Sequence, residues 1–103
     1  MRSQSQTCRA AAIQMAPVLF DRDATTAKIV KIIAKCGRED IRLAVFPETI
    51  IPNYPYFAWL QPPAVIADLH ERLYEQAVDV PGPVTDALSA AAKASGTVVI
   101  IGI

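Results

Sequence analysis

Cysteine and histidine are scarce in this chain of 103 residues, which contains two cysteines and one histidine. A structural zinc site needs about four ligands at short spacings, and a disulfide framework needs several cysteine pairs. Cys8, Cys36 and His70 form neither pattern, so we expect no metal site. We interpret both cysteines as small core residues and His70 as a structural histidine with one hydrogen bond.

Net charge is also absent, because ten basic and ten acidic residues cancel. A chain with no net charge has no long-range electrostatic attraction to nucleic-acid phosphates or anionic lipid. No apolar run approaches the roughly 20 residues that cross a bilayer, and the polar lead at residues 1–7 lacks the apolar core of a signal peptide. We therefore expect a cytoplasmic protein with neither nucleic acid nor membrane as a partner.

Apolar residues are abundant, at 52% of the chain against 19% charged residues, which is typical of one globular unit. Their spacing predicts the order strand, helix, strand, loop, helix, helix, strand. The expected ranges are about 9–15, 22–36, 43–46, 51–59, 65–77, 83–95 and 97–103. Helical crossovers between strands imply parallel pairing, and continuous apolar runs predict strands buried on both faces.

Glu48 follows the second apolar run, directly after Pro47, and precedes a stretch rich in proline and aromatic residues at 51–59. In open α/β sheets, ligands collect at the carboxyl ends of strands, so an acid at this point is placed for proton transfer. An ionised carboxylate in so apolar a neighbourhood would cost several kcal/mol without partners. We therefore favour a functional acid, walled by rings that exclude water, over a solvated loop carboxylate.

Four segments together resemble the nitrilase branch of the carbon-nitrogen hydrolase superfamily. They are residues 9–18, 45–49, 51–56 and 73–83. The resemblance covers nearly all of the chain and implies an α/β fold, the N-terminal part of a four-layer α-β-β-α sandwich. It implies that residues 1–7 are a polar lead and that residues 8–103 are the N-terminal portion of a hydrolase domain truncated at its C-terminal end.

The resemblance also implies a Glu-Lys-Cys catalytic set, in which Glu48 matches the glutamate and acts as general base. The lysine and the nucleophilic cysteine of relatives lie beyond position 103, and neither Cys8 nor Cys36 matches the nucleophile's sequence context. Tyr54 is expected beside the pocket as a substrate-binding residue. Relatives often carry glycine before that tyrosine; Asn53 stands there, and asparagine tolerates a left-handed backbone.

The activity that the resemblance implies for the whole protein is hydrolysis of a nitrile to a carboxylic acid and ammonia through a Cys thioimidate. It calls for no metal or organic cofactor, and relatives assemble as homo-oligomers. The 103-residue piece alone is expected to be inactive. Two alternatives stay open: an amidase or carbamoylase of the same superfamily, and a catalytically silent assembly module. A nucleotide-binding domain is disfavoured, because no glycine-rich loop follows the first strand.

Overall fold

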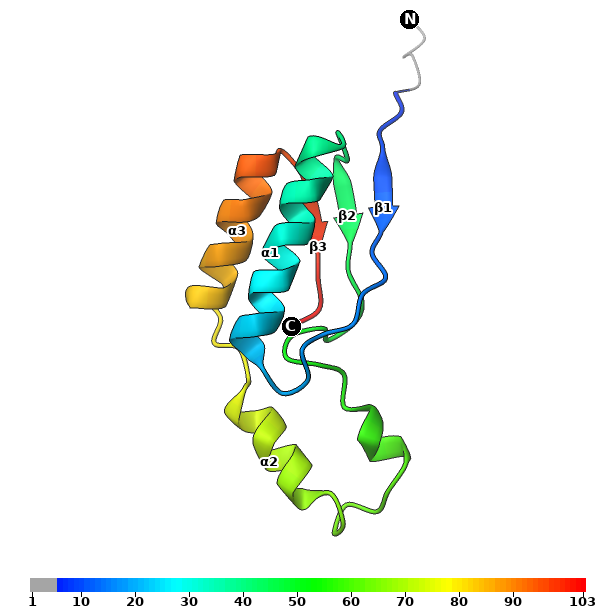
Figure 1. Ribbon diagram of the computed structural model, residues 1–103, viewed down its shortest axis with the longest axis vertical. Helices are drawn as coiled ribbons and strands as arrows, with labels where there is room; N and C mark the ends of the chain where they lie inside the picture. The colour runs from blue at the N-terminus through cyan, green and yellow to red at the C-terminus, as the bar shows by residue number, and fades with distance from the viewer. Residues whose placement is uncertain (1–5) are drawn as a thin grey trace, which may run out of the picture.

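A parallel three-stranded sheet with helices on one face is the centre of the computed structural model, which describes residues 6–103 (Figure 1). Residues 1–5 of the predicted polar lead lie outside the described residues. Ala10 pairs with Leu43, and Leu43 pairs in turn with Val98, so the strand order is β1-β2-β3. The strands are β1 (Ala10–Ala12), β2 (Leu43–Val45) and β3 (Val98–Ile100). The predicted parallel α/β fold is confirmed.

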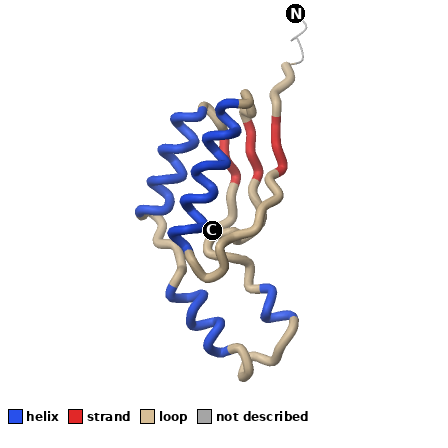
Figure 2. Tube along the Cα trace, viewed as in Figure 1, coloured by secondary structure: helices blue, strands red, loops and turns tan. Residues whose placement is uncertain are grey.

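Two long helices, α1 (Arg22–Arg38) and α3 (Pro83–Ser95), lie side by side on the same face of the sheet (Figure 2). Each connects neighbouring parallel strands, and right-handed crossovers that step in one direction place their helices on one face. Ile29 and Ile33 of α1 are fully buried against the sheet. The buried core consists of Ile29, Ile33, Cys36, Ala44, Phe46, Ile50, Ile51, Val84 and Leu88.

The ends of these helices follow local signals with one exception. α3 begins at Pro83 and ends before Gly96, whose φ of 61° is left-handed, as the sequence predicts. α1 begins after its Asp21 cap but continues through Gly37 to Arg38, two residues past the expected end at about residue 36. The reason is packing, because a Cβ on Gly37 would lie 2.8 Å from the Ser95 Cβ of α3.

The second face of the sheet is open in the described part of the chain. Val98 is 64% exposed and Ile100 is 56% exposed, while Ala44 on the helix-facing side is buried. The prediction of strands buried on both faces is therefore wrong for residues 6–103, because both long helices lie on the opposite face. The described residues form one sheet and one helical layer, two of the four layers that the resemblance implies.

A smaller lobe lies beyond the carboxyl ends of the strands and contains η1 (Tyr56–Trp59) and α2 (Ala67–Glu75) (Figure 1). No residue of α2 itself is buried, and Tyr74 is 83% exposed. Ile66, just before α2, is buried. Among the helices of residues 6–103, none is long and apolar enough to cross a membrane.

The two cysteines differ in environment. Cys36 is buried in the core, as predicted, but Cys8 is exposed because it precedes β1 instead of lying within a strand. The backbone N–H of Ile41, just before β2, donates to the Cys36 carbonyl at 2.9 Å. Both cysteines therefore lie near the amino ends of the strands.

Candidate active site

Glu48 lies in the turn that follows β2, the middle strand of the sheet. On one side of it, the Phe46 N–H donates to the Ile100 carbonyl at 2.8 Å. On the other side, the Ile50 N–H donates to the Gly102 carbonyl at 3.0 Å. The turn is thus held on both sides of Glu48 by the end of β3 and the chain that follows it. Glu48 occupies the carboxyl end of a parallel strand, where the sequence predicted it.

The side chain of Glu48 is exposed in the described part of the chain. The aromatic residues that were expected to wall it off are mostly exposed themselves, namely Tyr54, Tyr56 and Trp59. Phe57 is buried, but its ring packs against Phe20 and His70. The predicted water-excluding enclosure is therefore wrong for residues 6–103, because these rings pack on Phe20 and His70 or face solvent.

A pocket of about 380 Å³ opens beside this turn, between the turn, α2 and the end of β3. Its lining is mostly apolar, with polar groups from Thr49, Asn53, His70 and Tyr74. The lining residues are Thr49, Ile51, Pro52, Asn53, His70, Leu73, Tyr74, Ala77, Val78 and Ile103. Glu48 and Tyr54 are sequence neighbours of lining residues, but neither lines the pocket, so the described residues do not bring the two into one cavity.

Two residues that the sequence did not indicate shape this turn, Thr49 within it and Gly102 in the chain that continues β3. Thr49 has a φ of 47°, a left-handed conformation that is uncommon for a β-branched residue. A Cβ on Gly102 would lie 2.4 Å from the Thr49 backbone nitrogen. The available signal was a glycine within the run of β-branched residues at 97–103, which often marks the close approach of another backbone.

Asn53 has a different role from the predicted one, since the left-handed residues near it are Thr49 and Phe20. Asn53 is 1% exposed, and its Oδ1 accepts a hydrogen bond from the Phe20 N–H at 2.8 Å. Its Nδ2 donates to the Tyr54 carbonyl at 3.3 Å. The side chain therefore joins the β1–α1 loop to the segment that carries Tyr54.

Replacing Asn53 by Ala in the whole protein is expected to lower the free energy of unfolding by about 1–3 kcal/mol, because the Phe20 N–H loses its acceptor. Chemical denaturation measures the change. The matched control is Gln61→Ala, which removes an exposed amide from the same lobe and should stay within about 0.5 kcal/mol of wild type. Equal effects of the two substitutions would contradict the role given to Asn53.

Aromatic contacts fix the lobe to the β1–α1 loop. The ring centroids of Phe20 and Phe57 are 5.9 Å apart, and the ring of His70 meets Phe57 edge-on at 5.1 Å. The guanidinium carbon of Arg72 lies 4.5 Å from the centroid of Phe20. Among the described contacts, this edge-on packing replaces the single hydrogen bond predicted for His70.

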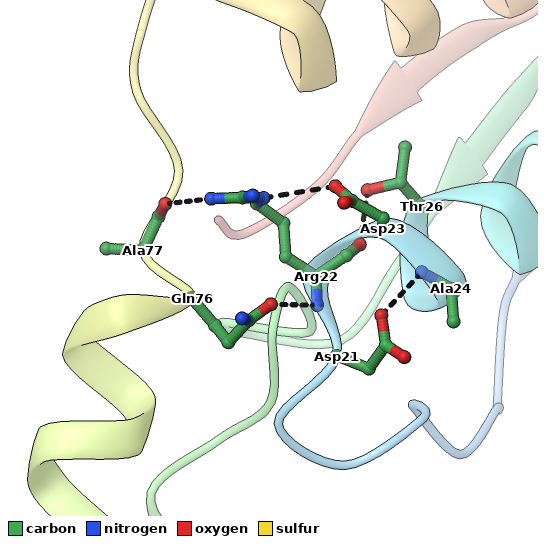
Figure 3. Close-up of polar contacts among 7 residues, drawn as sticks. All are labelled: Asp21, Arg22, Asp23, Ala24, Thr26, Gln76 and Ala77. Atoms are coloured by element: carbon green, nitrogen blue, oxygen red, sulfur yellow. Dashed lines mark hydrogen bonds and ion pairs between the residues drawn. The ribbon is translucent and has the colours of Figure 1, made fainter.

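Arg22 makes a second connection between the lobe and the helical layer (Figure 3). Its backbone N–H donates to Oε1 of Gln76 at 2.8 Å, and its Nη1 donates to the Ala77 carbonyl at 3.1 Å. Its Nε pairs with Asp23 at 3.1 Å. These contacts tie the chain just after α2 to the first turn of α1, so the pocket wall that α2 provides is anchored at its C-terminal end.

Comparison with known proteins identifies the family. Residues 9–103 match the carbon-nitrogen hydrolase family. The chain belongs to this family. In this carbon-nitrogen hydrolase chain, Glu48 lies at the carboxyl end of the sheet, whereas Cys8 and Cys36 lie near the amino ends of the strands. The two cysteines and Glu48 are thus at opposite ends of the parallel sheet.

Several curated relatives of this carbon-nitrogen hydrolase chain are named nitrilases. "Nitrilase 3" from an unknown prokaryotic organism is 46% identical over 97 residues, covering 92% of this chain and 29% of the relative. A nitrilase from Paraburkholderia phymatum is 43% identical over 101 residues, covering 98% of this chain and 30% of the relative. An aliphatic nitrilase from Rhodococcus rhodochrous is 36% identical over 104 residues, covering 100% of this chain and 28% of the relative. The chain thus spans about 30% of the length of these relatives, and the predicted resemblance is confirmed.

Proposed function

We propose that the protein containing this chain is a nitrilase that converts a nitrile to a carboxylic acid and ammonia. The observation that carries the proposal is the similarity to nitrilases at 46% and 43% identity over 92% and 98% of the chain. Glu48 is the general base, because it is the acid at the carboxyl end of the middle strand. Tyr54, on the segment that Asn53 fixes, contacts the substrate.

The chemistry requires a base, because a nitrile carbon is a weak electrophile and a thiol near pKa 8.5 is mostly protonated at neutral pH. The Glu48 carboxylate takes the thiol proton, the sulfur bonds to the nitrile carbon, and the nitrogen gains a proton to give a thioimidate. A first water, deprotonated by Glu48, adds to this carbon, and ammonia leaves to give a thioester. A second water then releases the carboxylic acid and restores the thiol.

The nucleophilic cysteine and the lysine that stabilises charged intermediates come from polypeptide outside these 103 residues. Cys8 and Cys36 do not supply the nucleophile, because both lie near the opposite end of the sheet from Glu48. Residues 8–103 form the N-terminal portion of the hydrolase domain. The remaining elements of the proposal are a homo-oligomeric assembly, a cytoplasmic location and catalysis without a cofactor.

Ammonia release by the whole protein from paired nitriles and amides tests the proposal. We expect turnover of aliphatic or aromatic nitriles and slower turnover of the matching amides. The 103-residue chain alone is the negative control, since a base without its nucleophile cannot perform covalent catalysis. Faster turnover of amides or carbamoyl compounds would favour an amidase or carbamoylase, and no turnover of any of them would favour a silent assembly module.

A further inference from the structure

The backbone that carries Glu48 makes an unusually close contact with the chain that continues β3. An ideal Cβ built on Gly102 would lie 2.4 Å from the Thr49 nitrogen, 3.1 Å from the Glu48 Cα and 3.2 Å from the Glu48 carbonyl carbon. All three are backbone atoms, so no side-chain rotation relieves the overlap. Only glycine fits at position 102 without moving the turn.

The same turn holds a backbone conformation that its own sequence disfavours. Thr49, next to Glu48, has a φ of 47°, and β-branched residues rarely adopt positive φ. Such a conformation persists only where the surrounding structure over-determines it. The hydrogen bond from the Ile50 N–H to the Gly102 carbonyl, at 3.0 Å, supplies that constraint directly after Thr49.

We infer that Gly102 is a positioning residue for Glu48. Its missing side chain lets the chain after β3 run against the Glu48–Thr49 peptide, and its carbonyl holds the turn closed, so β2 and β3 together set the position of the backbone that carries the carboxylate. The inference rests on the proposed role of Glu48 as base. It adds that the geometry of this base depends on a residue that touches neither the substrate nor the reacting atoms.

The test is Gly102→Ala in the whole protein, with Gly37→Ala as the matched control. Both variants place a methyl group into a close contact, but Gly37 faces Ser95 between α1 and α3, near the amino ends of the strands. For Gly102→Ala we expect kcat per folded molecule to fall about a hundredfold with KM nearly unchanged, as for a misplaced catalytic group. For Gly37→Ala we expect a lower melting temperature with unchanged kcat per folded molecule.

A double-mutant cycle with Glu48→Gln separates positioning from general damage. If Gly102 acts through the carboxylate, Gly102→Ala causes no further loss of kcat once Glu48 is replaced. If the two losses of kcat instead multiply in the double variant, the inference is overturned. A wild-type kcat in Gly102→Ala would also overturn it. Full turnover in Glu48→Gln would instead refute the base role itself, so failure of the inference and failure of the proposed function are distinguishable.

Thr49→Gly is the second variant in case Gly102→Ala does not fold. Glycine accepts positive φ without strain, so the fold is retained, but the turn gains freedom and the backbone that carries the carboxylate loses its fixed position. We expect a lower kcat with a melting temperature close to that of wild type. A kcat equal to wild type in Thr49→Gly would overturn the inference without any information from position 102.

Discussion

Glu48→Gln in the whole protein is expected to lower kcat for nitrile hydrolysis by about a hundredfold to ten-thousandfold, the range for loss of a general base. Glutamine keeps the size of the side chain but cannot accept the thiol proton. The fold should survive, since the Glu48 side chain is exposed in the described residues. Ammonia release at saturating nitrile, combined with thermal unfolding, measures both quantities.

The matched control for this experiment is Glu71→Gln, which makes the same chemical change on an exposed residue of α2. Its turnover should equal that of wild type. If Glu48→Gln retains turnover like the control, Glu48 has no part in proton transfer, and another group must serve as the base.

Ile100→Asp is expected to lower the stability of the whole protein, but to leave the stability of the isolated chain nearly unchanged and to raise its solubility. Ile100 lies on the open face of the sheet and is 56% exposed here. In the predicted sandwich a second sheet covers this face, so the whole protein would bury a carboxylate without a partner, at a cost of several kcal/mol. The isolated 103-residue chain, in which the face is open, should instead lose little stability and gain solubility.

Urea unfolding of the whole protein and light scattering of the isolated chain measure these two effects. Ala90→Asp is the control, because it places the same charge on the exposed side of α3. Its cost should not exceed the helix propensity difference, about 0.7 kcal/mol. Equal costs for both substitutions in the whole protein would mean that nothing covers the open face.

Local signals in the sequence predicted both ends of α3 and the start of α1, because caps act within one or two turns of the residues that make them. Pro83 and Gly96 delimit α3 as predicted, and Asp21 caps α1. The end of α1 was missed because Gly37 is there for contact with Ser95 of a distant helix, and no local pattern distinguishes a packing glycine from a terminating one.

The position of Glu48 was also predictable, since an apolar run followed by proline and an acid marks the end of a strand. Its surroundings were not. The contact between Thr49 and Gly102, and the hydrogen bond from Phe20 to Asn53, join residues far apart in the chain. Apolar composition alone predicted a dry enclosure around Glu48, but composition does not determine which way rings face, and those of the lobe pack on Phe20 or remain exposed.

The place of β2 between two strands has a mechanical consequence for the pocket. Glu48 follows the strand that is hydrogen-bonded on both sides, whereas α2 has no buried residue of its own and is held by buried Ile66 before it and by the Arg22 contacts after it. The pocket thus has one wall fixed along the sheet and one wall fixed only at the two ends of α2. We therefore expect any change in the width of the cavity to come from α2 and not from the turn that carries Glu48.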